Sequence, residues 1–145
     1  MFESLLRRLA APAPDPLTEP DARLALAALL VRLARTDGLY SADEVERIDR
    51  VLMQRHGLSA FEAAALRHEA EDLEGAAPDT VRFTRSIKAA VPLAERADLM
   101  QAMWSVVLSD GLRDEEEDRL MRLVANLLGL SDVDSALARQ KADGA

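Results

Sequence analysis

The sequence repeats itself once, and each copy is centred on an Asp-Gly turn. The matched segments are 36–39 with 109–112 and Glu44 with Glu117 at an offset of 73 residues, then 57–59 with 129–131 after a one-residue deletion. Each copy is a helix, a turn and a further helix, and the unit is too long and occurs too few times for a solenoid. The duplication therefore predicts two similar halves packed about an approximate twofold axis.

Both halves are predicted to be helical throughout. Alanine and leucine dominate, β-branched residues are sparse, and turn signals recur between apolar stretches of helical periodicity. Two stretches, 21–35 and 93–109, are apolar nearly all round, so they belong at the centre of the core. The other expected helices are 2–9, one that starts at the Ser41 capping box and ends at Gly57, 59–73, 79–91, 114–128 and one that starts at Ser131. The chain is accordingly assigned to the all-α class, as a compact bundle.

Local signals fix several of the expected helix ends. Ser41 with Glu44 and Ser59 with Glu62 form S-x-x-E capping boxes, and glycines at 57 and 129 are suited to helix C-termini. A proline-rich strap follows the first short helix, so residues 1–20 are set apart from a single domain over 21–140. Residues 141–145 are expected to be a frayed tail.

Composition excludes several classes of protein. The absence of cysteine removes disulfide scaffolds, thiolate-bound zinc, iron–sulfur clusters and thiol nucleophiles. A net charge of -8 disfavours nucleic acid and anionic membranes as general partners and favours a cation or a basic partner. The longest apolar run, Leu24–Val31, is far too short to span a bilayer, and no signal segment opens the chain, so a cytoplasmic protein is expected.

Acidic side chains gather around both Asp-Gly turns. Asp37 and Asp110 each follow a long predicted helix, where the helix dipole disfavours a carboxylate by up to about 1 kcal/mol. Glu44 and Glu117 lie in the first turn of the next helix. Because Ca²⁺ and Mg²⁺ prefer oxygen ligands, the acidic residues around the two turns form a candidate site for a divalent cation, although the spacing is not that of an EF-hand. The alternative is that they act only as turn and capping residues.

The remaining candidates carry weaker signals. Arg82, Arg85 and Lys88 form a basic stripe, which is interpreted as a solvated face; the alternatives are that it neutralises an acidic turn within the molecule or contacts an acidic partner. Met100, Met103 and Trp104 are interpreted as core residues rather than a ligand pocket. No phosphate-binding loop and no nucleophile motif is present, so catalytic residues and enzymatic activity are not expected.

The doubled pattern of a buried helix, Asp-Gly, a glutamate and an amphipathic helix ending in glycine resembles the tellurite-resistance protein B (TerB) family. The opening MFESLLRRL and the run DTVRFTRSIK at 79–88 are similar to a bacterial TerB-like branch. The resemblance covers residues 21–135 and implies an all-α fold of about seven helices with a pseudo-twofold. It also implies no enzymatic activity and divalent metal at Asp37, Glu44, Asp110 and Glu117.

The family is associated with tellurite and stress responses, with membrane-linked complexes and with DnaJ-like co-chaperones. Two hypotheses follow for this chain. One is a stress-associated module that binds a protein partner and a divalent cation at the acidic turns. The other is a plain protein-interaction scaffold, co-chaperone-like, with no metal role.

Overall fold

The computed structural model describes residues 6–7, 19–35, 40–76, 88, 93–108 and 115–143. All regular secondary structure within these ranges is helical. The helices are α2 (Glu19–Ala34), α3 (Ala42–His56), α4 (Ala60–Ala76), α6 (Leu93–Val107), α7 (Glu115–Leu127) and α8 (Asp132–Asp143). The predicted strap and the predicted helices at 2–9 and 79–91 lie almost wholly outside the described residues.

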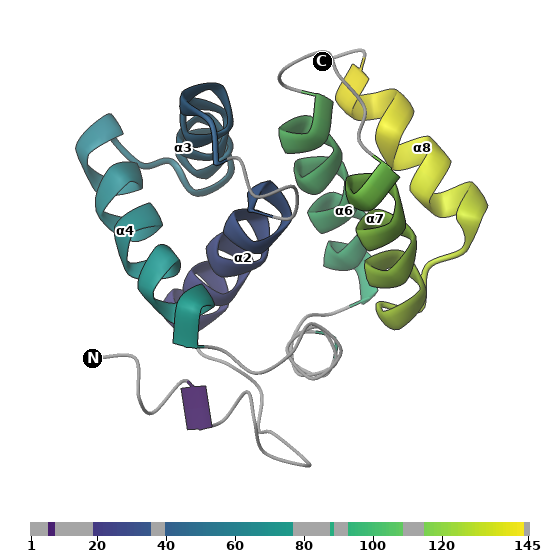
Figure 1. The fold of residues 1–145 in the computed structure, drawn as a ribbon, viewed down its shortest axis with the longest axis horizontal. Coiled ribbons are helices and arrows are strands. Elements are labelled where there is room, and N and C mark those ends of the chain that lie inside the picture. Colours follow the sequence, from purple (N-terminus) through teal and green to yellow (C-terminus); the bar gives the residue numbers. More distant parts are fainter. Residues whose placement is uncertain are drawn as a thin grey trace.

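The helices form two groups of three (Figure 1). Helices α2, α3 and α4 lie on one side and α6, α7 and α8 on the other. Within the first group α2 packs mainly on α4, and in the second α6 packs on α8 to the same extent. The described parts of the two groups do not meet symmetrically, because α3 packs on α6 while α7 makes no comparable contact with α2.

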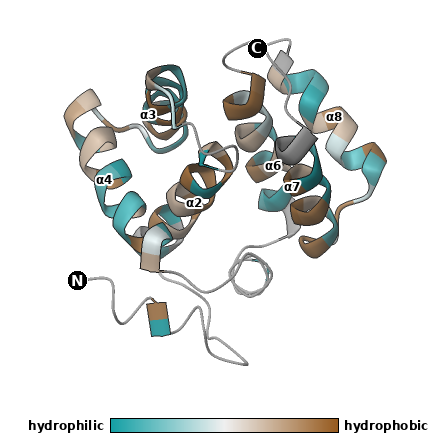
Figure 2. Ribbon diagram, viewed as in Figure 1, coloured by the Kyte–Doolittle hydropathy of each residue, from teal (hydrophilic) through white to brown (hydrophobic). Residues whose placement is uncertain are grey.

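Helices α2 and α6 form the centre of the core, as their sequences predict. Hydrophobic residues predominate along both, whereas α4 and α8 alternate between hydrophobic and hydrophilic residues (Figure 2). Leu29, Leu30 and Leu33 of α2 and Met100 and Met103 of α6 are fully buried. This arrangement leaves the amphipathic helices to cover the central pair.

The helices of the two halves begin and end with the same capping motifs. Gly57 and Gly129 both adopt a left-handed backbone, with φ of 65° and 76°. The residue after each glycine donates its N–H to a carbonyl five residues back, Leu58 to Met53 and Leu130 to Ala125. These are Schellman-type ends, and they confirm glycine as the helix terminator in both copies.

Capping boxes then start α4 and α8. Ser59 N donates to Glu62 Oε1 at 2.9 Å, and Ser131 N donates to Asp134 Oδ2 at 3.1 Å. The hydrogen bond from the serine backbone lowers the pKa of each carboxyl below its ordinary value. Equivalent residues therefore make equivalent bonds, which confirms the duplication at the level of single atoms.

The last turns of α4 and α8 contact other parts of the molecule. Helix α4 continues through Gly75 to Ala76 rather than ending near residue 73. Arg35 Nη1 holds the Glu74 carboxylate at 2.7 Å, which ties this last turn to α2. Helix α8 continues to Asp143, and Ala142 of its last turn packs against the core.

Candidate functional site

The start of α3 holds the one predicted cation ligand whose side chain the structure describes. Glu44 Oε1 accepts hydrogen bonds from the backbone N and the hydroxyl of Ser41, both at 3.1 Å. Ser41 Oγ in turn accepts from Glu44 N at 3.2 Å, which completes the predicted capping box. Glu44 is only 4% exposed, and it is the single buried charged side chain of the described residues. Its carboxylate therefore caps the N-terminus of α3.

The structure does not describe the side chains of the other three predicted ligands. Asp37 and Asp110 lie outside the described residues, and Glu117 falls in α7 with its side chain outside them. Within the described ranges, no three acidic or histidine side chains lie close enough together to hold a metal. The predicted cation site is thus neither assembled nor contradicted by the described part of the chain.

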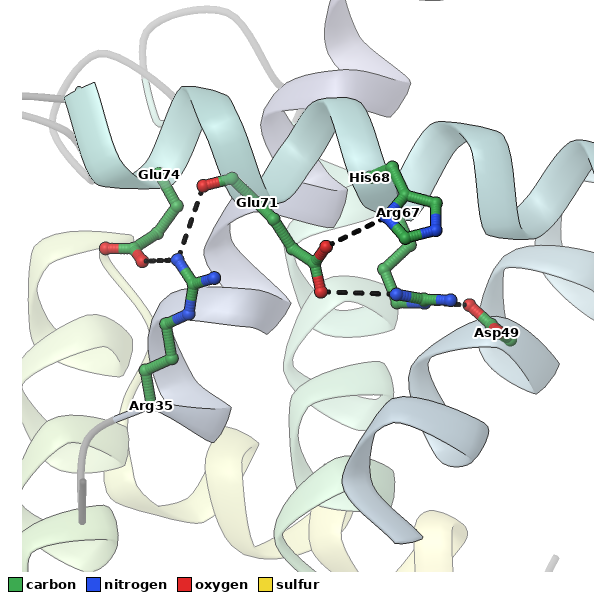
Figure 3. A network of polar contacts seen from close by, with 6 residues as sticks. All are labelled: Arg35, Asp49, Arg67, His68, Glu71 and Glu74. Atoms are coloured by element: carbon green, nitrogen blue, oxygen red, sulfur yellow. Dashed lines mark hydrogen bonds and ion pairs between the residues drawn. The ribbon is translucent and has the colours of Figure 1, made fainter. Parts of the chain in front are cut away.

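A polar network joins α3 and α4 (Figure 3). Arg67 lies at its centre, with Nε donating to Asp49 Oδ1 at 2.6 Å and Nη1 donating to Glu71 Oε2 at 3.2 Å. His68 Nδ1 lies 3.2 Å from the other Glu71 oxygen. This network was not predicted from the sequence. The i,i+4 spacing of Arg67 and Glu71 was a readable signal, but Asp49 is eighteen residues away from Arg67 on another helix.

Helix α2 joins the same face of α4 through two arginines. Arg35 Nη1 donates to the Glu71 carbonyl at 3.3 Å as well as to Glu74, and Arg32 Nε reaches Glu74 Oε2 at 3.3 Å. The Arg35 guanidinium also lies over the Tyr40 ring, 5.1 Å from its centroid. These ion pairs and hydrogen bonds link the C-terminal end of α2 to α4.

The network perturbs two of its own groups. Burial, followed by the neighbouring Glu71, raises the pKa of Tyr40 above its ordinary value. Burial alone would raise the pKa of Glu71, but Tyr40 and the Arg67 charge outweigh it and hold that pKa below the ordinary value. The Tyr40 hydroxyl is buried and makes no hydrogen bond of regular geometry, although it lies close enough to Glu71 for each group to shift the pKa of the other.

The predicted basic stripe is described only at Lys88, because Arg82 and Arg85 lie outside the described residues. Lys88 is half-buried, and its Nζ lies beside Gly129, 3.6 Å from where a Cβ at that glycine would stand. Arg96 Nη1 donates to the Leu128 carbonyl at 3.2 Å and Nη2 to the Lys88 carbonyl at 3.1 Å. Two cations thus lie at the C-terminal end of α7, where the helix dipole favours positive charge.

A cavity of about 220 Å³ lies between α6, α7 and α8. Trp104 forms part of its wall, with Nε1 donating to Ser135 Oγ at 3.2 Å and the Arg139 guanidinium 5.4 Å from the ring centroid. The charged residues of the wall are Asp118, Arg122, Asp132 and Arg139. Met100 and Met103 are core residues as predicted, whereas Trp104 is buried and also borders this cavity.

Comparison with known proteins decides the family. The family model of tellurite resistance protein TerB matches residues 23–140, which includes all of α3, α4, α6 and α7. The chain belongs to the TerB family. No curated protein and no solved structure matches it significantly. The all-α fold expected from the resemblance is confirmed for this TerB chain.

The surface of this TerB domain exposes four large apolar side chains among the described residues. These are Phe61 at 84%, Val133 at 67%, Leu137 at 50% and Leu123 at 39% exposure. Phe61 and Val133 occupy equivalent positions, each between the two members of a capping box at the start of α4 or α8. None of the described helices combines the length and the apolar character needed to cross a membrane.

Proposed function

We propose that this TerB chain is a non-enzymatic, tellurite-resistance-like module that binds a protein partner through the apolar side chains at the starts of α4 and α8. The observation that carries the proposal is the equivalence of Phe61 and Val133. A single exposed apolar residue is ordinary on a protein surface. Two exposed apolar residues at the same position of a duplicated unit, each in the first turn after a capping serine, are better explained by a shared contact role.

We also propose a second, basic contact for the same partner, on the basis of the sequence. Arg82, Arg85 and Lys88 are the proposed basic residues for an acidic surface on it. Lys88 is half-buried beside α7, so its charge already interacts with the C-terminal end of that helix. The partner is therefore expected to lose more affinity on substitution of the two arginines than on substitution of Lys88.

The test of partner binding is affinity capture from the native host with the full chain. The variant Phe61→Ser with Val133→Ser should lose the specific partner, because both residues are exposed and their replacement should leave the fold intact. The matched control is Glu69→Ser with Gln140→Ser, which changes exposed polar residues on the same two helices. Equal recovery of the partner by both variants would contradict the proposed contact.

A divalent cation at Asp37, Glu44, Asp110 and Glu117 is the second candidate ligand. It is supported by the burial of Glu44, a charged group in the first turn that follows the Asp-Gly sequence. Titration calorimetry of the metal-free chain with Ca²⁺, Mg²⁺, Mn²⁺ and Zn²⁺ tests it, and absence of heat at millimolar cation removes it. Glu44→Gln should weaken cation binding without loss of stability, because glutamine also serves a capping box.

A further inference from the structure

The two halves of the molecule differ at one interface. Helix α4 packs extensively on α3, whereas α8 makes only sparse contact with α7. The packing of α4 on α2 and of α8 on α6 is nevertheless alike. The cavity of about 220 Å³ lies at the loosened interface. Comparison of the α3–α4 interface with the α7–α8 interface therefore identifies the side chains that the second half lacks.

Apolar volume is missing on α7. The buried residues Ile48, Val51 and Leu52 of α3 correspond to Met121, Val124 and Ala125 of α7 at the offset of 73. Leu52 is fully buried in the first half, and its counterpart Ala125 borders the cavity. The isobutyl group of a leucine is thus absent where the second half is hollow.

A carboxylate is missing as well. Arg67 of α4 corresponds to Arg139 of α8, and its partner Asp49 corresponds to Arg122 of α7. Where the first half has an ion pair of 2.6 Å, the second half has two arginines on the wall of the same cavity. Within the described part of the chain, neither Arg122 nor Arg139 forms an ion pair, and Arg139 instead lies over Trp104.

The cavity has no net charge, because Asp118 and Asp132 also border it. Long-range attraction therefore does not select its occupant. Selection comes from short-range complementarity, since a guanidinium binds a carboxylate by directed hydrogen bonds. At the corresponding positions of α3 the first half carries a buried leucine, Leu52, and, three residues before it, the carboxylate of Asp49.

We propose that the cavity between α7 and α8 binds a helical segment of a protein partner that inserts an aliphatic side chain and an adjacent carboxylate. The aliphatic group takes the place that Leu52 fills in the first half, and the carboxylate bonds Arg122 and Arg139 as Asp49 bonds Arg67. The inference rests on the proposed function in assuming a protein partner, and it names that partner's chemistry. The cavity volume of about 220 Å³ leaves room for such a pair of side chains.

The probe is a set of N-acetylated, C-amidated helical peptides without aromatic residues, with leucine and glutamate three or four positions apart. Binding to the full chain is followed by the fluorescence of Trp104, the only tryptophan in the sequence. At least one glutamate peptide should bind about tenfold more tightly than its glutamine counterpart. Absence of binding by every member at millimolar concentration, or equal binding of glutamate and glutamine peptides, would overturn the proposal.

Two variants close the cavity by copying the first half. Arg122→Asp gives Arg139 the partner that Arg67 has, and Ala125→Leu restores the missing leucine. Both should abolish peptide binding while the melting temperature stays the same or rises, so loss of binding cannot be ascribed to unfolding. Arg50→Asp, an equal charge change on the exposed face of α3, should bind as the wild type does. Wild-type binding by both cavity variants would overturn the proposal.

Competition separates this site from a small-molecule site. Millimolar 4-methylpentanoate, which joins an aliphatic group to a carboxylate, should compete only weakly with the peptide. Complete displacement at concentrations at which the peptide itself binds would assign the cavity to a small acid and overturn the peptide proposal. Partner capture through Phe61 and Val133 does not depend on Arg122, so the two proposals fail separately.

Discussion

Arg67 Nε and Asp49 Oδ1 lie 2.6 Å apart and join α4 to α3, with the two side chains only 11% and 24% exposed. The Arg50–Glu46 pair on α3 has the same distance of 2.6 Å, but its side chains are 57% and 63% exposed. The pairs therefore differ in burial rather than in geometry. Burial decides their contribution, because an exposed pair is screened by water and gains little.

Asp49→Ala should lower the free energy of unfolding by about 1–3 kcal/mol, because it leaves the Arg67 guanidinium largely buried without this partner. Glu46→Ala, the matched control on the same helix, should change it by less than about 0.5 kcal/mol. Urea denaturation of the two variants measures both values. Equal losses would show that burial of the pair contributes nothing.

Acid should weaken the fold through Glu71. Its pKa in the folded chain lies below the ordinary value of 4.5, so its ionised form stabilises the fold above pH 4.5. That contribution is lost as the pH falls below 4.5 and through the folded pKa. Glu71→Gln should show a smaller acid loss in denaturation curves recorded between neutral pH and pH 3, whereas Glu69→Gln, on the exposed side of α4, should follow the wild type.

The capping boxes should contribute similar amounts in the two halves. Ser41→Ala and Ser131→Ala each remove a hydroxyl that accepts a first-turn N–H, and each should cost about 1 kcal/mol. Chemical denaturation of both variants measures the loss. A negligible effect at Ser41 would show that Glu44 alone satisfies the start of α3.

Many of the helix ends can be predicted from the local sequence. Ser41, Ser59 and the glycines at 57 and 129 predict helix ends because capping depends on residues only a few positions apart. The Asp49–Arg67 pair could not be predicted, because it depends on how α3 and α4 cross. The cavity beside Ala125 could not be predicted either, because it depends on how closely α6, α7 and α8 pack together. Of the predicted cation ligands, only Glu44 has a described side chain, and its capping role was predicted correctly.

The cation proposal makes different predictions for the melting temperature of an Asp37 and Asp110 double variant with and without metal. If Asp37 and Asp110 bind a cation, Asp37→Asn with Asp110→Asn should slightly raise the melting temperature of the metal-free chain by relieving like-charge repulsion. The same variant should abolish the rise in melting temperature that added cation gives the wild type by mass action. Thermal unfolding with increasing cation measures both effects. Clear destabilisation of the double variant with and without metal would make the aspartates structural.

The most direct test of partner binding is site-specific photo-crosslinking in the native host, with a photoreactive amino acid at Phe61 or Val133 of the full chain. Glu69 and Gln140, exposed polar positions on the same helices, serve as controls. We expect one crosslinked partner of the same mass from both apolar positions and none from the controls. No crosslink at either apolar position, or the same products from all four positions, would contradict it.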